Sequence, residues 1–249
     1  MTQHGYGRLP DLGDFRDHKF SMLHGLALPS SVDLRTSCSS IDDQGQLGAC
    51  TSFATGEAIR YARRKQGLQD FPLSHLYLYF NSRPANQKGV DSGASLKDTV
   101  KSAAKMGDCQ EEDWPYDITR FASRPPAKSY KDALKDRALS YMRVTQDPNQ
   151  MKNCLAQNFP IVIGFTVYSS FESAQVASSG IVPMPGPSEQ VLGGHAVLVC
   201  GYSDIDKMFL VRNSWGTGWG MQGYFKMPYA YLLNGSLASD FWTIRTITP

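Results

Sequence analysis

The sequence lacks a strong charge excess, a long apolar run and any internal repeat. Lys plus Arg number 25 and Asp plus Glu number 23, which leaves a formal net charge of +2. A balance this close to zero does not favour nucleic acid or an anionic membrane surface as a partner, and no motif of a nucleic-acid-binding module occurs. Because no uninterrupted apolar stretch reaches about 18 residues, no transmembrane helix is expected. We expect a monomer that acts without nucleic acid and without a membrane.

The N-terminus also lacks a recognisable signal peptide. Its first residues, MTQHGYGRLPDLGDFRDHKF, contain no apolar stretch of the kind that such a peptide needs. The chain therefore stays in the cytoplasm, leaves the cell by a route that does not read a signal peptide, or has been trimmed. The compartment stays open at this point.

Cysteine is scarce, and its spacing does not fit the common zinc or redox motifs. The cysteines are Cys38, Cys50, Cys109, Cys154 and Cys200. Their odd number leaves at least one unpaired within the chain, no C-x-x-C occurs, and no Cys/His cluster has zinc-ligand spacing. Without a signal peptide we favour free thiols in small core sites over disulfides. No metal and no other cofactor is expected.

The spacing of apolar residues changes about halfway along the chain. Helical periodicity, capping residues and terminal glycines dominate the first half, whereas short β-branched and aromatic runs dominate the second. The predicted helices span 50–66, 73–83, 95–107 and 147–157, and the predicted strands span 161–168, 196–202, 209–212 and 224–227. A helical half followed by a strand-rich half indicates an α+β fold of two lobes, with a natural place for a peptide cleft between them.

Cys50 occupies a position that favours a reactive thiolate. It follows Gly48-Ala49, which allow a sharp turn, and it begins the predicted helix 50–66. A helix N-terminus carries roughly half a positive charge, which lowers the pKa of a thiol placed there. The Cys50 backbone N–H is also left without a partner inside the helix and could therefore bind an oxyanion.

A thiolate of this kind also needs a histidine, and His195 is the best of five. His4, His18 and His24 lie in the N-terminal extension, and His75 on the second helix is expected to be a surface or packed residue. His195 follows Gly193-Gly194 and begins a strand, so its side chain can project into the cleft. A hairpin of strands 196–202 and 208–212 would return Asn213 to the side of His195, where it could orient the imidazole.

Several segments resemble the papain-like cysteine peptidase family. QGQLGAC at 44–50 resembles the cysteine segment of the family, GHAV at 194–197 with GY at 201–202 resembles its histidine strand, and NSWGTGWG at 213–220 is nearly identical to its asparagine motif. LPSSVDLR at 28–35 looks like the start of the mature domain, and SGASL at 92–96 looks like the substrate-binding strand. The resemblance covers about Leu28 to the C-terminus and is that of a bacterial-type member with a short N-terminal extension.

The resemblance implies a papain-like α+β fold of two lobes. We expect residues 28–249 to form the peptidase domain, with a mainly helical lobe at about 36–127. The second lobe, a β-barrel-like antiparallel sheet, is expected at about 128–239 plus 28–35, and residues 240–249 are expected to cross back as a tail. Residues 1–27 form the extension.

The resemblance also implies roles for individual residues. Cys50 attacks a peptide carbonyl, His195 pairs with it and protonates the leaving amine, and Asn213 holds the imidazole under the shield of Trp215. The Gln44 amide and the Cys50 N–H form the oxyanion hole. Gly93 and Ala94 pair with the substrate backbone. The positions matching the main specificity pocket are Leu96, Gly164, Gly194 and Ala196, for which packing or turn geometry is the alternative explanation.

Departures from the family pattern leave the chemistry intact. Leu47 replaces a family cysteine, Thr51 replaces the tryptophan after the nucleophile, and Gly194 replaces a residue that is often polar. None of these positions supplies a group that the reaction requires.

The extension and the type of cleavage leave alternatives. Residues 1–27 are either a short pro-segment or lid that inhibits the enzyme as a zymogen, or a tail on the back of the domain. The lid hypothesis rests on Tyr6, Leu9, Leu12, Phe15 and Phe20, which need burial. We expect an endopeptidase acting on protein or peptide substrates through a thioester acyl-enzyme. The alternatives are an exopeptidase, transpeptidase or amidase with the same site, or a catalytically silent peptide-binding protein.

Overall fold

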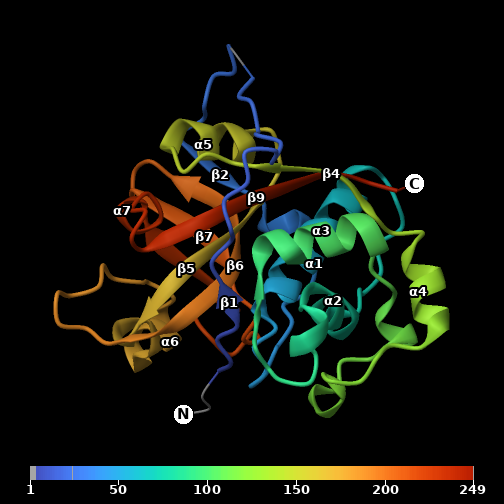
Figure 1. Ribbon diagram of the computed structural model, residues 1–249. Coiled ribbons are helices and arrows are strands. Elements are labelled where there is room, and N and C mark those ends of the chain that lie inside the picture. Colours follow the sequence, from blue (N-terminus) through green and yellow to red (C-terminus); the bar gives the residue numbers. More distant parts are fainter. Residues whose placement is uncertain (1–3, 24, 249) are drawn as a thin grey trace.

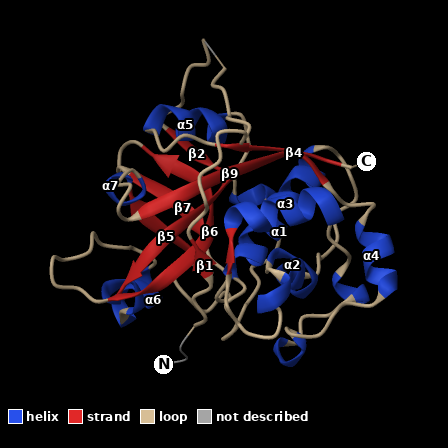
Figure 2. Ribbon diagram, viewed as in Figure 1, coloured by secondary structure: helices blue, strands red, loops and turns tan. Residues whose placement is uncertain are grey.

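A computed structural model describes residues 4–23 and 25–248, so His24 lies outside the described residues. Helices gather on one side of the molecule and a twisted antiparallel sheet lies on the other (Figures 1 and 2). The N-terminal segment, blue in Figure 1, runs between the two groups. No helix in the described ranges has the length and apolar character needed to cross a bilayer.

The helical side is formed by α1, α2, α3 and α4. Their bounds are Cys50–Lys65, His75–Ser82, Leu96–Met106 and Ala127–Ala133. The local sequence explains where α3 begins and ends, since the Ser95 hydroxyl accepts from the Asp98 N–H and Gly107 follows the last turn with φ 74°. This side also carries strand β3, Ala94–Ser95, which leads directly into α3.

The other side is a seven-stranded sheet in the order β4-β9-β5-β6-β7-β8, with β2 also paired to β6. The strand bounds are Ser31–Asp33 (β2), Ala138–Arg143 (β4), Ile161–Tyr168 (β5), Val191–Ser203 (β6), Met208–Arg212 (β7), Tyr224–Pro228 (β8) and Ala238–Ile247 (β9). The helices α5, α6 and α7 span Pro148–Ala156, Ala174–Ser179 and Tyr229–Leu232. The Asp147 side chain caps α5, as its sequence predicts, by accepting from the Asn149 and Gln150 N–H groups.

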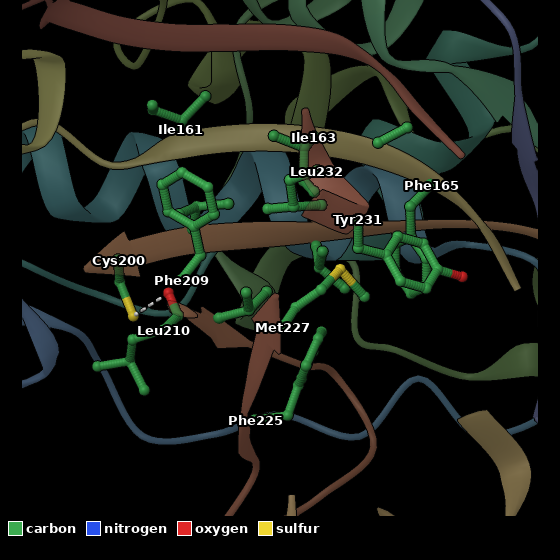
Figure 3. Close-up of a cluster of buried hydrophobic side chains, with 14 of the residues drawn as sticks. Ile161, Ile163, Phe165, Cys200, Phe209, Leu210, Phe225, Met227, Tyr231 and Leu232 are labelled. Carbon is green, nitrogen blue, oxygen red and sulfur yellow. Dashed lines mark hydrogen bonds between the residues drawn. The ribbon is translucent and has the colours of Figure 1, made fainter. Parts of the chain in front are cut away.

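Two hydrophobic clusters join the sheet to the rest of the chain. One lies within the sheet lobe and includes Phe209, Phe225 and Met227, all three of which are fully buried (Figure 3). The other places Ala54 and Ala58 of α1 against sheet residues including Trp242. The long helix that begins at Cys50 is therefore fixed against the strands that carry His195.

The structure corrects parts of the predicted organisation. The helical lobe continues past the predicted boundary at 127, because α4 packs through Ala133 and Tyr130 onto the cluster that contains Tyr77. Residues 240–249 were predicted as a tail, but 238–247 form β9, which pairs with β4 and β5. Strand β6 begins at Val191, before the predicted start at 196. The described cysteines are all free thiols.

The cluster in Figure 3 gives a first test of the fold. We expect Phe209→Ala to lower the free energy of unfolding by about 3–5 kcal/mol, because it leaves a cavity in a fully buried site. Ile205→Ala is the matched control, since Ile205 is 88% exposed and its change should stay within about 0.5 kcal/mol. Urea unfolding measures both variants, and equal losses would contradict the assigned core.

Candidate active site

Cys50 is the first residue of α1 and is completely buried. The turn before it is held from outside the helix, since the Gly48 N–H donates to the Asp91 carboxylate at 3.0 Å and the Tyr79 hydroxyl also donates to Asp91. These contacts fix the backbone of the nucleophile's turn against the helical lobe. The sequence analysis did not single out Asp91 or Tyr79, and no motif signals them.

His195 and Asn213 are brought together by the β6–β7 hairpin. The strands pair antiparallel with Leu198 opposite Arg212, so Asn213 returns to the side of His195. The distance from His195 Nε2 to Asn213 Oδ1 is 2.8 Å, and both side chains are buried. The other ring nitrogen, Nδ1, is buried without a hydrogen-bond partner among the described residues. The imidazole is thus held at one nitrogen and has the other available for a proton transfer.

Aromatic rings enclose the imidazole. Trp215 stacks on His195 with ring centroids 4.9 Å apart, and Phe165, opposite His195 in β5, approaches its ring edge at 5.7 Å. The Asn213 Oδ1 atom accepts a second hydrogen bond, from the Ser214 N–H at 2.9 Å, which fixes the amide orientation. These contacts exclude water from the His195–Asn213 pair.

Gln44 is fully buried and lies beside the turn that leads to Cys50. Its Oε1 atom accepts from the Ser214 hydroxyl at 2.6 Å, so the amide nitrogen is directed the other way. That nitrogen donates to the Leu47 carbonyl at 2.9 Å and to the Gly5 carbonyl at 3.0 Å. Ser214 is a positioning contact for Gln44 that the sequence analysis missed. The Gly5 carbonyl of the N-terminal extension therefore accepts a hydrogen bond from the Gln44 amide, the group predicted to bind an oxyanion.

The backbone of the extension crosses this site in close contact with neighbouring backbone segments. Arg8–Leu9 forms strand β1, which pairs parallel with β3 so that Arg8 lies opposite Ala94. The Ala94 N–H donates to the Gly7 carbonyl at 2.8 Å. A Cβ atom on Gly7 would lie 1.7 Å from the Gly48 carbonyl oxygen, and one on Gly93, whose φ is 71°, would lie 2.1 Å from the Gly7 carbonyl oxygen. The absence of side chains at these positions permits this close approach.

The side chains on either side of Gly7 point to different parts of the cleft. Tyr6 meets His195 edge-on at 6.1 Å, and His4 stacks on Trp215 at 4.0 Å. Arg8 extends in the other direction, toward Gly164 and Gly194. The apolar residues predicted for the same pocket, Leu96 and Ala196, are buried.

Acidic side chains anchor the rest of the extension. Asp11 accepts from the Trp242 indole at 2.8 Å and from the Lys97 N–H at 2.9 Å, and Asp17 pairs with Arg143 at 3.0 Å. The expectation that large apolar residues hold the extension is wrong for Leu9, Leu12 and Phe15, which are 42%, 85% and 94% exposed. Of the large apolar residues proposed for burial, Phe20 is fully buried in the core.

Burial disfavours the charged forms of Cys50 and His195. Complete burial raises the pKa of the Cys50 thiol, although N–H groups of Gly7, Ala196 and Thr51 act in the opposite direction. Burial lowers the pKa of His195 to about 4, against the effect of its hydrogen bond to Asn213. Both groups are therefore neutral at neutral pH while the extension is in place, and the predicted thiolate–imidazolium pair requires an open cleft.

The described residues include no cluster of three or more His, Cys, Asp or Glu side chains that could hold a metal ion. The groups at the site are a thiol, an imidazole and carboxamides, which fit nucleophilic attack on a carbonyl.

The sequence profile described as papain family cysteine protease matches residues 28–237. The chain belongs to the papain family of cysteine proteases, and it is a papain-like cysteine peptidase by its family and by its structural neighbours. The predicted family and the predicted α+β fold of two lobes are thereby confirmed.

Individual relatives agree with this assignment. Xylellain, a cysteine protease from Xylella fastidiosa, superimposes with a TM-score of 0.92 at 38% identity, covering 98% of this chain and 96% of its own. An uncharacterized peptidase C1-like protein of Acanthamoeba polyphaga mimivirus is 42% identical over 83% of this chain and 70% of its own length. Cathepsin L of Sarcophaga peregrina is 30% identical over 81% of this chain, which spans only 59% of that relative.

The depressed pKa of His195 predicts that acid opens the cleft. A proton binds the open state more tightly, because there the pKa returns toward its ordinary value of 6.5 from about 4. Opening should therefore increase as pH falls from 7 toward 5, by up to about tenfold per pH unit for one proton. His4 adds to the effect, since burial also lowers its pKa.

Hydrogen exchange of residues 5–9, corrected for intrinsic rates, measures this opening. A chain carrying both His4→Gln and His195→Gln should lose most of the pH dependence, because glutamine does not titrate. Exchange that is flat between pH 7 and 5 in the unaltered protein would contradict the linkage.

Proposed function

We propose that the protein is a cysteine endopeptidase that works through a thioester acyl-enzyme and that its own N-terminal extension holds it inactive. The observation that carries the proposal is that one short stretch of the extension contacts each predicted site group: the Gly5 carbonyl accepts from the Gln44 amide, the Gly7 N–H lies at Cys50, and Tyr6 packs on His195.

The reaction begins once the extension leaves. Water reaches His195, the imidazole gains basicity, and the Cys50 thiol transfers its proton to His195 Nδ1, with the α1 N-terminus stabilising the thiolate. The sulfur then attacks the carbonyl carbon of a peptide bond. The Gln44 amide and the Cys50 N–H donate to the oxygen as it becomes negative.

Collapse of this intermediate breaks the C–N bond and leaves a thioester on Cys50. The His195 imidazolium gives its proton to the departing amine, and Asn213 keeps the ring in the plane required for both transfers. A water molecule, deprotonated by His195, then attacks the thioester carbonyl. The thiol is regenerated as the carboxylic acid product leaves.

The extension itself is oriented against cleavage at Gly7. The Gly7 N–H is directed at the Cys50 sulfur as a hydrogen-bond donor, and the Gly7 carbonyl accepts a hydrogen bond from the Ala94 N–H. The Gly7 carbonyl is thus bonded to Ala94 rather than to the Gln44 amide, so it does not occupy the proposed oxyanion hole as a scissile carbonyl would.

The course of the extension favours an endopeptidase over an exopeptidase. It continues from the Cys50 position toward Trp215 on one side, through Tyr6 and His4, and past β3 on the other side, through Leu9 and Pro10. A cleft that holds a chain on both sides of the nucleophile can hold the middle of a substrate. A catalytically silent peptide-binding protein is the weaker candidate, because every group that the reaction requires is present.

Adding a side chain at one glycine of the extension should relieve the inhibition. Gly7→Leu in the full chain should displace the segment around β1, because no Cβ fits beside the Gly48 carbonyl. We expect the rate of Cys50 alkylation by an epoxide inhibitor at pH 6 to rise at least tenfold. Gly13→Leu is the matched control in the same extension, since a Cβ on Gly13 has no atom within 4 Å. Equal labelling rates in both variants would show that the extension does not block the nucleophile.

The chemistry is tested in the same opened background. Gly7→Leu protein should hydrolyse a peptide blocked at both ends, and adding Cys50→Ala should abolish this activity. Adding Gln44→Ala should lower kcat by about 10²–10³, the usual cost of one oxyanion donor. Mass spectrometry of the products locates the cut. Cleavage confined to residues next to an unblocked end would favour the exopeptidase, and an opened protein that neither cleaves nor reacts with the epoxide would be a silent binder.

A further inference from the structure

One short segment carries both groups that are proposed to stabilise the oxyanion. Gln44 lies at the start of the segment 44–50 and Cys50 at its end, so the spacing of the two donors depends on the backbone between them. Oxyanion donors lower a barrier only when they already stand where the negative oxygen will be. The contacts that fix this segment therefore bear directly on the proposed chemistry.

The start of the segment is held by partners from both sides of the cleft. The Gln44 N–H donates to the Ser214 carbonyl at 2.9 Å, and the Gln44 carbonyl accepts from the Tyr116 hydroxyl at 2.9 Å. Together with the hydrogen bond from the Ser214 hydroxyl to the Gln44 side chain, these contacts fix both the backbone and the amide of Gln44.

The end of the segment is held by one side chain, that of Asp91. The Gly48 N–H lies 3.0 Å from Asp91 Oδ2 and 3.3 Å from Oδ1, and this N–H has no other acceptor among the described residues. A Cβ on Gly48 would lie 3.0 Å from the same Oδ1 atom, so the carboxylate packs directly against the Gly48 backbone. Because Gly48 closely precedes the nucleophile, this contact fixes the backbone that leads to the Cys50 N–H.

The Tyr79 hydroxyl connects Asp91 to the segment predicted to bind the substrate backbone. It donates to Asp91 Oδ1 and accepts from the Gly93 N–H at 3.1 Å. Burial, and after it the hydrogen bond to Asp91, raise the pKa of Tyr79 above its ordinary value, so the hydroxyl keeps the proton that it donates. A chain of three hydrogen bonds thus runs from Gly93, the neighbour of Ala94, to Gly48.

Arg83 fixes the chain on the other side of Asp91. Its side chain is buried, donates to the Val90 carbonyl at 2.6 Å and lies over the Tyr79 ring at 4.2 Å. Burial lowers the pKa of Arg83, and Asp91 is among the negative charges that oppose this shift. The position of the Asp91 carboxylate is therefore set by α2 and the residue that follows it.

These contacts belong to the domain and do not depend on the extension. A Cβ on Gly48 would lie 3.1 Å from the Gly7 Cα, so in the closed protein Gly7 also presses on this turn. Once the extension leaves, the contact with Gly7 is lost and the contact with Asp91 stays. Asp91 is itself exposed to solvent, so its carboxylate can be removed without leaving a buried charge.

We propose that Asp91 is a positioning residue for the reaction, which acts through the Gly48 N–H to hold the Cys50 N–H at the distance from the Gln44 amide that an oxyanion requires. This inference rests on the proposed peptidase function and adds a residue that does not touch the substrate. Tyr79 orients the Asp91 carboxylate and keeps the turn aligned with the strand that begins at Ala94.

The test measures hydrolysis of a blocked peptide by the full chain carrying Gly7→Leu. Adding Asp91→Ala should lower kcat about 5–20-fold and leave KM within about twofold, because a displaced oxyanion donor weakens transition-state binding alone. Asp91→Asn keeps one acceptor oxygen and should recover part of this loss. The rate at which dipyridyl disulfide modifies Cys50, followed by mass spectrometry, should stay within about twofold, since that exchange forms no oxyanion.

Double variants separate positioning from a general loss of structure. In a chain that already carries Gln44→Ala, Asp91→Ala should lower kcat by less than about threefold, because one of the two donors that it aligns is missing. Tyr79→Phe should lower kcat in the same direction as Asp91→Ala and add little to it, because both variants break the same chain of hydrogen bonds. Full additivity in both pairs would contradict the proposed route.

Asp204→Ala is the matched control, since Asp204 accepts from the Tyr229 hydroxyl at 3.0 Å in the sheet lobe. It should leave kcat and KM unchanged. The inference is wrong if Asp91→Ala leaves kcat unchanged, or if it lowers kcat and the dipyridyl disulfide rate equally. A Gly7→Leu chain that neither cleaves peptide nor reacts at Cys50 would instead overturn the peptidase function itself.

A second readout does not depend on catalysis. In the Gly7→Leu chain with Cys50→Ala, NMR follows hydrogen exchange of the Gly48 amide. Asp91→Ala should speed this exchange at least about tenfold, the usual effect of losing a hydrogen bond to a charged group, whereas Asp204→Ala should not change it. Equal exchange with and without the Asp91 carboxylate would show that it does not hold the turn.

Discussion

The structure depends on a close approach of two backbones at the nucleophile. Gly7 of the extension passes so near Gly48 that any Cβ would meet the Gly48 carbonyl oxygen at 1.7 Å, and Gly5 is as restricted beside Gln46. Glycine alternates with larger residues in this segment. The glycines allow the backbone to contact the turn before Cys50, and the side chains of Tyr6 and Arg8 lie in different parts of the cleft. A short extension can therefore fill the site without a folded domain of its own.

Burial in the filled cleft also affects the protonation states of Cys50 and His195, the proposed nucleophile and base. The fold places Cys50 at a helix N-terminus, hydrogen-bonds His195 to Asn213 at 2.8 Å and stacks Trp215 on the imidazole. Burial, however, raises the pKa of Cys50 and lowers the pKa of His195. The proposed inhibition thus has a steric part and an electrostatic part. The ion pairs of Asp11 and Asp17 with Arg143, in which the two carboxylates are only 1% and 4% exposed, hold the extension from outside the cleft.

The sequence alone predicted the residues whose local motifs are specific. Cys50 begins α1 and Asn213 lies beside His195 at the end of the β6–β7 hairpin, as short-range pattern and strand pairing predict. Their joint catalytic role remains a proposal. The ion pair between Arg8 and Asp240 could not be predicted in this way, because the two residues are distant in sequence and Asp240, with φ 63°, interrupts the strand pattern of β9. Leu12 and Phe15 were expected to be buried, but charged pairs rather than apolar contacts fix that part of the extension.

The central claim is that the extension, rather than the fold, keeps Cys50 inactive by lying along β3. The amide of Ala94 reports this contact directly, since it donates to the Gly7 carbonyl at 2.8 Å. Exchange of this single amide, followed by NMR in Gly7→Leu and Gly13→Leu proteins with Cys50→Ala, is the most direct measurement. The account predicts fast exchange in Gly7→Leu and protection in Gly13→Leu. Equal protection in both proteins would contradict it.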